Sequence, residues 1–165
     1  MGATGQLKAT GSTVTVQFDR SIDAPPEHVW AAITEPRLLG EWLADAELEG
    51  IVGGKVQLVW PGQGEMRGVV TVFEPNEVLE YSWNEEHSSL LRLEVGVTES
   101  GSTLRLIHSD ATREDATGLG AGWQAHLEAL DDVLAGTPSP AASRDARYEE
   151  LRPEYDRLLD AVPSS

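Results

Sequence analysis

The stretch TGLGAGWQAHLEALDDVLAG, residues 117–136, decides the fold, because it predicts one long amphipathic helix. Thr112 begins a TRED sequence that resembles a capping box, and Gly136 is a typical helix stop. We therefore expect a helix from about residue 113 to 135. Its large apolar residues recur every three or four positions and so share one face; they are Leu119, Trp123, Leu127, Leu130 and Leu134.

Three glycines, Gly118, Gly120 and Gly122, stand in the first part of this stretch. A dinucleotide-binding loop does not explain them, because its third glycine would fall at Trp123. If the segment is helical, Gly118 and Gly122 lie on one side, where missing side chains leave space at a cavity mouth or let the helix approach the sheet. If it is a loop, the helix begins near Ala121.

Composition narrows the partners and the chemistry. The 165 residues suit one domain, and 12 basic against 28 acidic residues give a formal charge of −16. Such a surface repels nucleic acid and anionic membranes. There is no cysteine, and no histidine spacing is typical of a metal site, so we expect neither a metal nor another cofactor. We find no signal peptide and no run of roughly 18 apolar residues, which predicts a cytoplasmic protein without membrane insertion.

The chain divides into three parts. We expect residues 1–11 to form a flexible N-terminus and residues 12–136 to form the folded domain. Residues 137–165 read as a linker and an extra helical tail with a break near Pro153. This tail could pack on its own domain or mediate homodimerisation, and the sequence leaves both open.

Within the domain, the pattern changes from strand to helix and back. Alternation over residues 13–22 predicts a strand, and Pro26 and Pro36 each predict the start of a short helix. Residues 45–110 alternate between apolar and polar positions, with turn signals between the segments. We therefore predict an α+β helix-grip fold. A curved antiparallel sheet of about six or seven strands wraps around the long C-terminal helix, and the two short helices follow the first strand.

Several segments resemble a known family over residues 12–136. They include APPEHVWAAIT, GGKVQLVW, GVVTVFEPNEVLEYSW and GWQAHLEALDDVLAG. In order and spacing they are similar to homologues of the activator of heat-shock protein 90 ATPase, within the START and birch-pollen-allergen-like superfamily, SRPBCC. The resemblance implies a helix-grip fold with an internal, mostly apolar cavity. Members bind lipids, steroids or polyketides, and some catalyse cyclisation.

The residues in phase with the apolar faces are the candidate ligand-binding residues. For each tryptophan the alternative is ordinary core packing. His108 could orient a ligand through a hydrogen bond, and its alternative is a histidine satisfied within the protein at the sheet rim. The full candidate set is Val16, Phe18, Trp42, Leu58, Trp60, Tyr81, Trp83, Leu93, Leu106, His108, Gly118, Gly122, Trp123 and Leu127.

These observations predict a module that binds a small hydrophobic or aromatic molecule between sheet and helix. One alternative is a cyclase or aromatase, for which His108 and Tyr81 are the only visible general acids or bases. A second alternative is a protein-interaction role of the co-chaperone kind. We assign no catalytic residue and expect no nucleic-acid partner.

Overall fold

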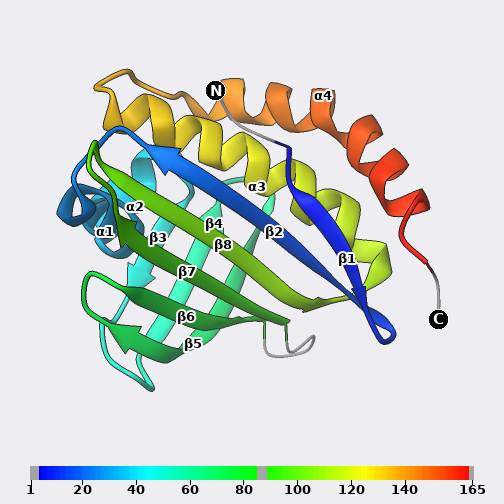
Figure 1. The fold of residues 1–165 in the computed structure, drawn as a ribbon, viewed down its shortest axis with the longest axis horizontal. Coiled ribbons are helices and arrows are strands. Elements are labelled where there is room, and N and C mark those ends of the chain that lie inside the picture. The colour runs from blue at the N-terminus through cyan, green and yellow to red at the C-terminus, as the bar shows by residue number, and fades with distance from the viewer. Residues whose placement is uncertain (1–3, 85–88, 164–165) are drawn as a thin grey trace.

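The computed structural model describes residues 4–84 and 89–163, so residues 85–88, within one of the predicted turns between strands, lie outside the described residues. Figure 1 labels the elements. In chain order they are β1 (Gln6–Thr10), β2 (Thr13–Ile22), α1 (Pro26–Thr34), α2 (Pro36–Trp42), β3 (Asp45–Leu48), β4 (Lys55–Trp60), β5 (Gly64–Glu74), β6 (Val78–Trp83), β7 (Ser89–Val97), β8 (Ser102–Ala111), α3 (Arg113–Leu134) and α4 (Ala141–Asp160). None of the described helices is long and apolar enough to cross a membrane.

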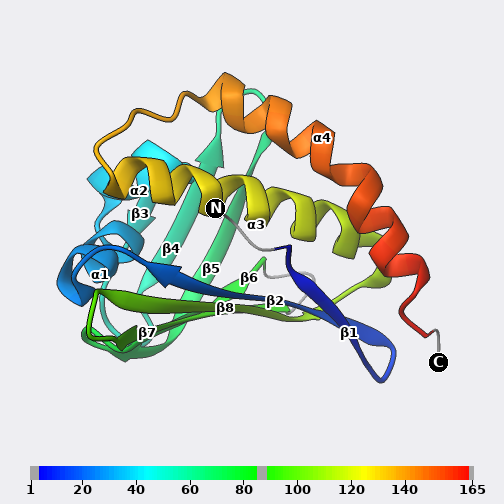
Figure 2. The ribbon, with the colours of Figure 1, turned by 45° about the horizontal axis from the view of Figure 1, so that its top comes forward.

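The described strands form one eight-stranded sheet in the order β1-β2-β8-β7-β6-β5-β4-β3. Each neighbouring pair is antiparallel. Figure 2 shows the sheet curling around α3, with α4 lying along the outer side of that helix. The predicted α+β helix-grip fold is therefore confirmed, with eight described strands where about six or seven were predicted.

Strand β1 corrects the expectation of a flexible N-terminus. It pairs with β2 from Gln6↔Gln17 to Thr10↔Thr13, across a turn in which Gly11 has a φ of 62°. Its side chains are mostly exposed, so it lacks the apolar alternation by which sequence analysis finds strands. The two short helices consequently follow the second strand, and residues 1–3 lie outside the described residues.

The helix boundaries largely follow local signals. Helices α1 and α2 begin at Pro26 and Pro36, as predicted. Helix α4 runs without interruption through Pro153, so the predicted break is wrong. Pro153 lies on the exposed side of α4, where water can satisfy the carbonyl group that the proline ring leaves without a donor.

Helix α3 spans Arg113–Leu134, which rejects the loop alternative for the glycine segment. The Thr112 hydroxyl accepts a hydrogen bond from the Asp115 backbone N–H at 3.1 Å, the N-terminal cap that the sequence predicts. Gly136 has a φ of 84°, the left-handed conformation that favours glycine after a helix.

The three glycines Gly118, Gly120 and Gly122 make room for side chains of α4 and not for the sheet. A Cβ atom on Gly120 would lie 2.7 Å from Cε1 and 2.9 Å from Cγ of Tyr155. Among the described residues, a Cβ on Gly118 would meet only the Tyr148 hydroxyl, at 3.3 Å. Tyr155 is fully buried, donates to Gln124 Oε1 at 2.7 Å and accepts from the Gly5 backbone N–H at 2.8 Å. The missing side chains thus let the tyrosines of α4 approach the backbone of α3.

The sheet bends sharply where β5 passes from β6 to β4. The pairing register of β5 shifts between Val70 and Val72. A Cβ on Gly68 would collide with the carbonyl group of Ser82, and the Ser82 hydroxyl accepts from the Val69 backbone N–H at 2.9 Å. This irregularity lets β4 rise beside α3, as Figure 2 shows.

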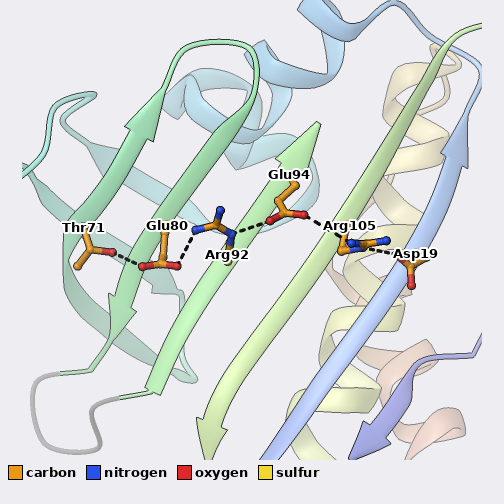
Figure 3. Close-up of polar contacts among 6 residues, drawn as sticks. All are labelled: Asp19, Thr71, Glu80, Arg92, Glu94 and Arg105. Atoms are coloured by element: carbon orange, nitrogen blue, oxygen red, sulfur yellow. Dashed lines mark hydrogen bonds and ion pairs between the residues drawn. The ribbon is translucent and has the colours of Figure 1, made fainter. Parts of the chain in front are cut away.

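The convex face of the sheet carries a ladder of alternating charges (Figure 3). Arg92 lies between Glu80 and Glu94, at 3.2 and 2.7 Å. Arg105 lies 2.7 Å from Asp19 and 3.8 Å from Glu94, and its hydrogen bond is the main cause that lowers the pKa of Asp19. Opposite charges on neighbouring strands stabilise the sheet and keep this face solvated. The ladder runs through Thr71, Glu80, Arg92, Glu94, Arg105 and Asp19.

Candidate functional site

An aromatic cluster centred on Trp83 fills part of the space between the sheet and α3. Its ring centroid lies 5.2 Å from that of His108, 5.3 Å from Trp123, 6.0 Å from Trp60 and 6.4 Å from Tyr81. The contacts to His108 and Trp123 are edge-to-face, which is a favourable arrangement of rings. The cluster therefore occupies interior space that the sequence analysis assigned to a ligand.

His108 is fully buried in this cluster, and both of its ring nitrogens have partners. Trp123 donates its indole N–H to His108 Nδ1 at 3.1 Å, so Nδ1 carries no proton. The proton of the neutral ring is then on Nε2, 3.0 Å from the Ser89 hydroxyl. Burial lowers the pKa of His108 to about 4, which keeps the ring neutral at physiological pH. His108 thus joins β8 to α3 and β7 as a satisfied internal histidine.

The predicted site residues separate into three groups. Trp60 and Gly122 line surface hollows beside α3, and Trp83 and Gly118 line a smaller hollow of 280 Å³ near Ser89. The remaining residues are buried and do not line these hollows, and their contact with a ligand stays a prediction. They are Val16, Phe18, Trp42, Leu58, Tyr81, Leu93, Leu106, His108, Trp123 and Leu127.

Two adjoining hollows, of 590 and 310 Å³, open between the end of β4, helix α3 and the start of α4. The larger one extends along the linker between α3 and α4 and reaches α2. Five of the described residues line both hollows, and we call the joined space the Trp60 cleft. They are Trp60, Gln63, His126, Arg144 and Asp145.

His126 presents an unpaired hydrogen-bond acceptor in the Trp60 cleft. Its Nδ1 lies 3.0 Å from the backbone carbonyl of Trp42, which can only accept, so Nδ1 carries the proton. Within the described residues Nε2 makes no hydrogen bond. It is also not fully buried, because the fully buried side-chain atoms without a partner in that part of the chain all belong to Arg20. Burial is the largest cause that lowers the pKa of His126 to about 4, and the charge of Arg144 also lowers it. At neutral pH, Nε2 is therefore a lone-pair acceptor open to the cleft.

The rim of the cleft is polar and held by the C-terminal part of the chain. Arg144 donates to the backbone carbonyls of Ser139 and Glu41, the latter at 3.3 Å, and so ties the linker to α2. Gln63 donates to Asp145 at 3.1 Å, which connects the turn after β4 to α4. Helix α4 is thus part of the cleft wall.

Arg20, a buried polar residue of β2, lies away from this cleft. Its guanidinium group is buried without a hydrogen bond in the described part of the chain, and Asp131 lies 3.8 Å from it. It also lies 5.8 Å from the ring centroid of Phe18. Arg20 therefore contributes charge between β2 and α3 and no group to the Trp60 cleft.

Sequence reasoning missed His126 and Arg144. His126 stands three positions after Trp123, on a neighbouring part of the same helix face, and this spacing was the available signal. Arg144 belongs to the tail, whose packing the sequence left open. In residues 4–84 and 89–163, no group of three His, Asp or Glu side chains could hold a metal ion.

Comparison with known proteins places most of the folded domain in a family. Residues 23–135 match the family described as Activator of Hsp90 ATPase homolog 1-like protein. The chain belongs to this family. The match begins before α1 and ends with α3, so it leaves out α4 and the part of the cleft that α4 supplies. It confirms the resemblance that the sequence segments indicate, and no curated protein matches the chain.

Solved structures show the same fold. The protein MLL2253 from Mesorhizobium loti is 31% identical with a TM-score of 0.69, over 76% of this chain and 99% of that one. CalU16 from Micromonospora echinospora is 24% identical with a TM-score of 0.77, over 98% of each chain. The Aha1 dimer from Colwellia psychrerythraea is 22% identical with a TM-score of 0.66, over 73% of this chain and 95% of that one. The match to CalU16 spans α4, whereas the other two cover a smaller share of this chain.

Proposed function

We propose that this chain binds a small hydrophobic or aromatic molecule in the Trp60 cleft. The observation that carries the proposal is the position of Trp60, a half-buried aromatic side chain that lines both hollows. Small-molecule sites are typically concave, largely apolar and furnished with a few polar groups. The cleft has this composition, with an aromatic wall, one histidine acceptor and a polar rim.

The size of the cleft also supports this function. The two volumes, 590 and 310 Å³, lie within the range of roughly 300–1,000 Å³ common for ligand pockets. Trp60 packs against Trp83 in a tilted ring contact, with 6.0 Å between ring centroids, which restricts the motion of its side chain. A rigid aromatic surface loses little conformational entropy on binding, which favours affinity.

The neutral fluorescent probe N-phenyl-1-naphthylamine tests the proposal. We expect saturable binding of one equivalent, at least tenfold weaker in Trp60→Leu, because this change removes the aromatic wall. Trp30→Leu is the matched control, since Trp30 packs against Phe73 outside the cleft, with 5.6 Å between ring centroids. Equal loss in both variants, or no binding by the wild type, would contradict the proposal. Native mass spectrometry of protein purified from its own source would identify a retained ligand.

The cyclase or aromatase alternative has less support. Its two candidate acid–base residues, Tyr81 and His108, are buried and do not line the Trp60 cleft. Burial raises the pKa of Tyr81 further above its ordinary value, so that its hydroxyl group stays protonated. Neither side chain is placed to exchange a proton with a molecule in the cleft.

Association between copies and cellular location are separate proposals. We propose a homodimer because the similar Colwellia protein is described as a dimer. Light scattering coupled to size-exclusion chromatography tests this, and a mass near 17.8 kDa at high concentration would contradict it.

The co-chaperone alternative predicts that the chain stimulates the ATPase of heat-shock protein 90. We also propose a cytoplasmic location, as the sequence analysis predicts; the cysteine-free sequence is consistent with a reducing compartment.

A further inference from the structure

We propose that the Trp60 cleft selects planar aromatic molecules that carry a hydroxyl group, and that His126 Nε2 accepts a hydrogen bond from this hydroxyl. The inference rests on the proposed ligand binding and goes beyond it by naming the chemical class. It follows from the tautomer of His126, from the charges at the cleft and from the position of Trp60.

The tautomer decides which group the ligand must present. The hydrogen bond from Nδ1 to the Trp42 carbonyl leaves Nε2 as an acceptor without a partner in the described residues. A ligand with only acceptor oxygens, such as a ketone or an ether, leaves this nitrogen unpaired when it displaces water from it. A ligand with a hydroxyl donor satisfies it, and an unmade hydrogen bond in a desolvated site costs affinity.

The charges around His126 favour a neutral ligand over an anion, and donor strength favours a phenol over an aliphatic alcohol. Arg144 and Asp145 act on His126 with opposite effects on its pKa, the arginine lowering it and the aspartate raising it. The formal charge of −16 and the carboxylate of Asp145 disfavour an anionic ligand. A phenol hydroxyl is more acidic than an aliphatic one and is therefore the stronger hydrogen-bond donor to the neutral Nε2.

The aromatic preference follows from the position of Trp60. The ring centroids of Trp60 and His126 are 6.4 Å apart, and their planes are inclined by 43°. A flat molecule on the Trp60 ring can place its edge beside the His126 ring, within reach of the Nε2 lone pair for an in-plane hydroxyl. Trp123, whose ring centroid is 6.2 Å from that of His126, supports the imidazole ring through an edge-to-face contact.

Displacement of N-phenyl-1-naphthylamine by 2-naphthol, 2-methoxynaphthalene and naphthalene tests the inference. The first two probes share a ring system and an oxygen, but only 2-naphthol has a proton to donate. We expect 2-naphthol to bind wild type about three- to tenfold more tightly than 2-methoxynaphthalene, the range of one net hydrogen bond. This comparison uses the wild-type chain and so does not depend on the folding of a variant.

The variant His126→Asn assigns the preference to Nε2. The asparagine amide reaches about as far as Nδ1 and can still donate to Trp42, but it has no atom at the position of Nε2. We expect the preference for 2-naphthol to fall to about onefold in this variant. His28→Asn, the same change at an exposed histidine outside the cleft, is the control and keeps the preference.

The outcomes separate the two proposals. If the fluorescent probe binds and depends on Trp60, but 2-naphthol and 2-methoxynaphthalene bind equally, the hydroxyl selection is wrong and ligand binding in the cleft stands. A preference that persists in His126→Asn overturns the assignment to Nε2. If none of the probes binds wild type, both proposals fail.

Discussion

Replacing Gly120 with alanine should destabilise the protein, although alanine is the better helix former. The new methyl group would lie 2.7 Å from Cε1 and 2.9 Å from Cγ of Tyr155, so one of the two helices must move. Tyr155 cannot turn away cheaply, because it is fully buried and hydrogen-bonded to Gln124 and to the Gly5 backbone. The substitution therefore sets helix propensity against packing.

The magnitude follows from opposing contributions. Alanine in a helix interior gains about 1 kcal/mol over glycine. Overpacking costs about 1–3 kcal/mol, and losing the hydrogen bonds of the Tyr155 hydroxyl costs about 1 kcal/mol each. We expect Gly120→Ala to lower the free energy of unfolding by roughly 1–3 kcal/mol.

Gly122→Ala is the matched control. Its Cβ would lie 3.8 Å from Cδ1 of Tyr148, an ordinary contact, so we expect it to raise the free energy of unfolding by up to about 1 kcal/mol. Urea unfolding followed by circular dichroism measures both variants. Tyr155→Leu in the Gly120→Ala background should reduce the cost of the alanine. Equal or higher stability of Gly120→Ala would refute the explanation by close helix packing.

Three further predictions concern the histidines, the buried hydrogen bond and the helix cap. Burial lowers the pKa of His108 and His126 to about 4, so the unfolded chain binds protons first as the pH falls. Stability should be complete above pH 6.5 and lost towards pH 4, by about 2 kcal/mol for each histidine at about pH 5. Equal urea midpoints at about pH 7 and pH 5 would contradict this. Trp123→Phe removes the donor to His108 Nδ1 and should cost about 1–3 kcal/mol in the same assay at neutral pH. Thr112→Ala removes the acceptor for the Asp115 backbone N–H and should cost about 1 kcal/mol, whereas Thr112→Ser should retain most of the stability.

Local patterns were sufficient to predict most of the secondary structure. The three- and four-residue spacing from Leu119 to Leu134 predicted α3, and Thr112 and Gly136 predicted its ends, because caps act over a few residues. Strand β1 was missed because its stability comes from pairing with β2 and not from an apolar pattern of its own. The break at Pro153 was predicted from propensity alone, and tertiary packing of α4 overrides it.

The candidate site could be predicted only in part. The aromatic residues were correctly placed on inward faces, but periodicity gives the direction of a side chain and not whether a neighbour or a ligand fills the space it enters. Trp83 and Trp123 fill that space together, while Trp60 at the end of β4 remains partly open. His126 Nε2 became a candidate only when the carbonyl of Trp42, a distant residue in the chain, was found at Nδ1.

The sequence by itself determined the class of fold, the long helix and the family, because spacing, caps and turns are read within short segments. Tertiary structure alone decided what the three glycines do and where the cleft lies. Both depend on α4, which packs on α3 through contacts such as Gly120 with Tyr155 and brings Arg144 beside His126. Contacts between residues far apart in the chain depend on shape and free volume in three dimensions, which no local pattern encodes.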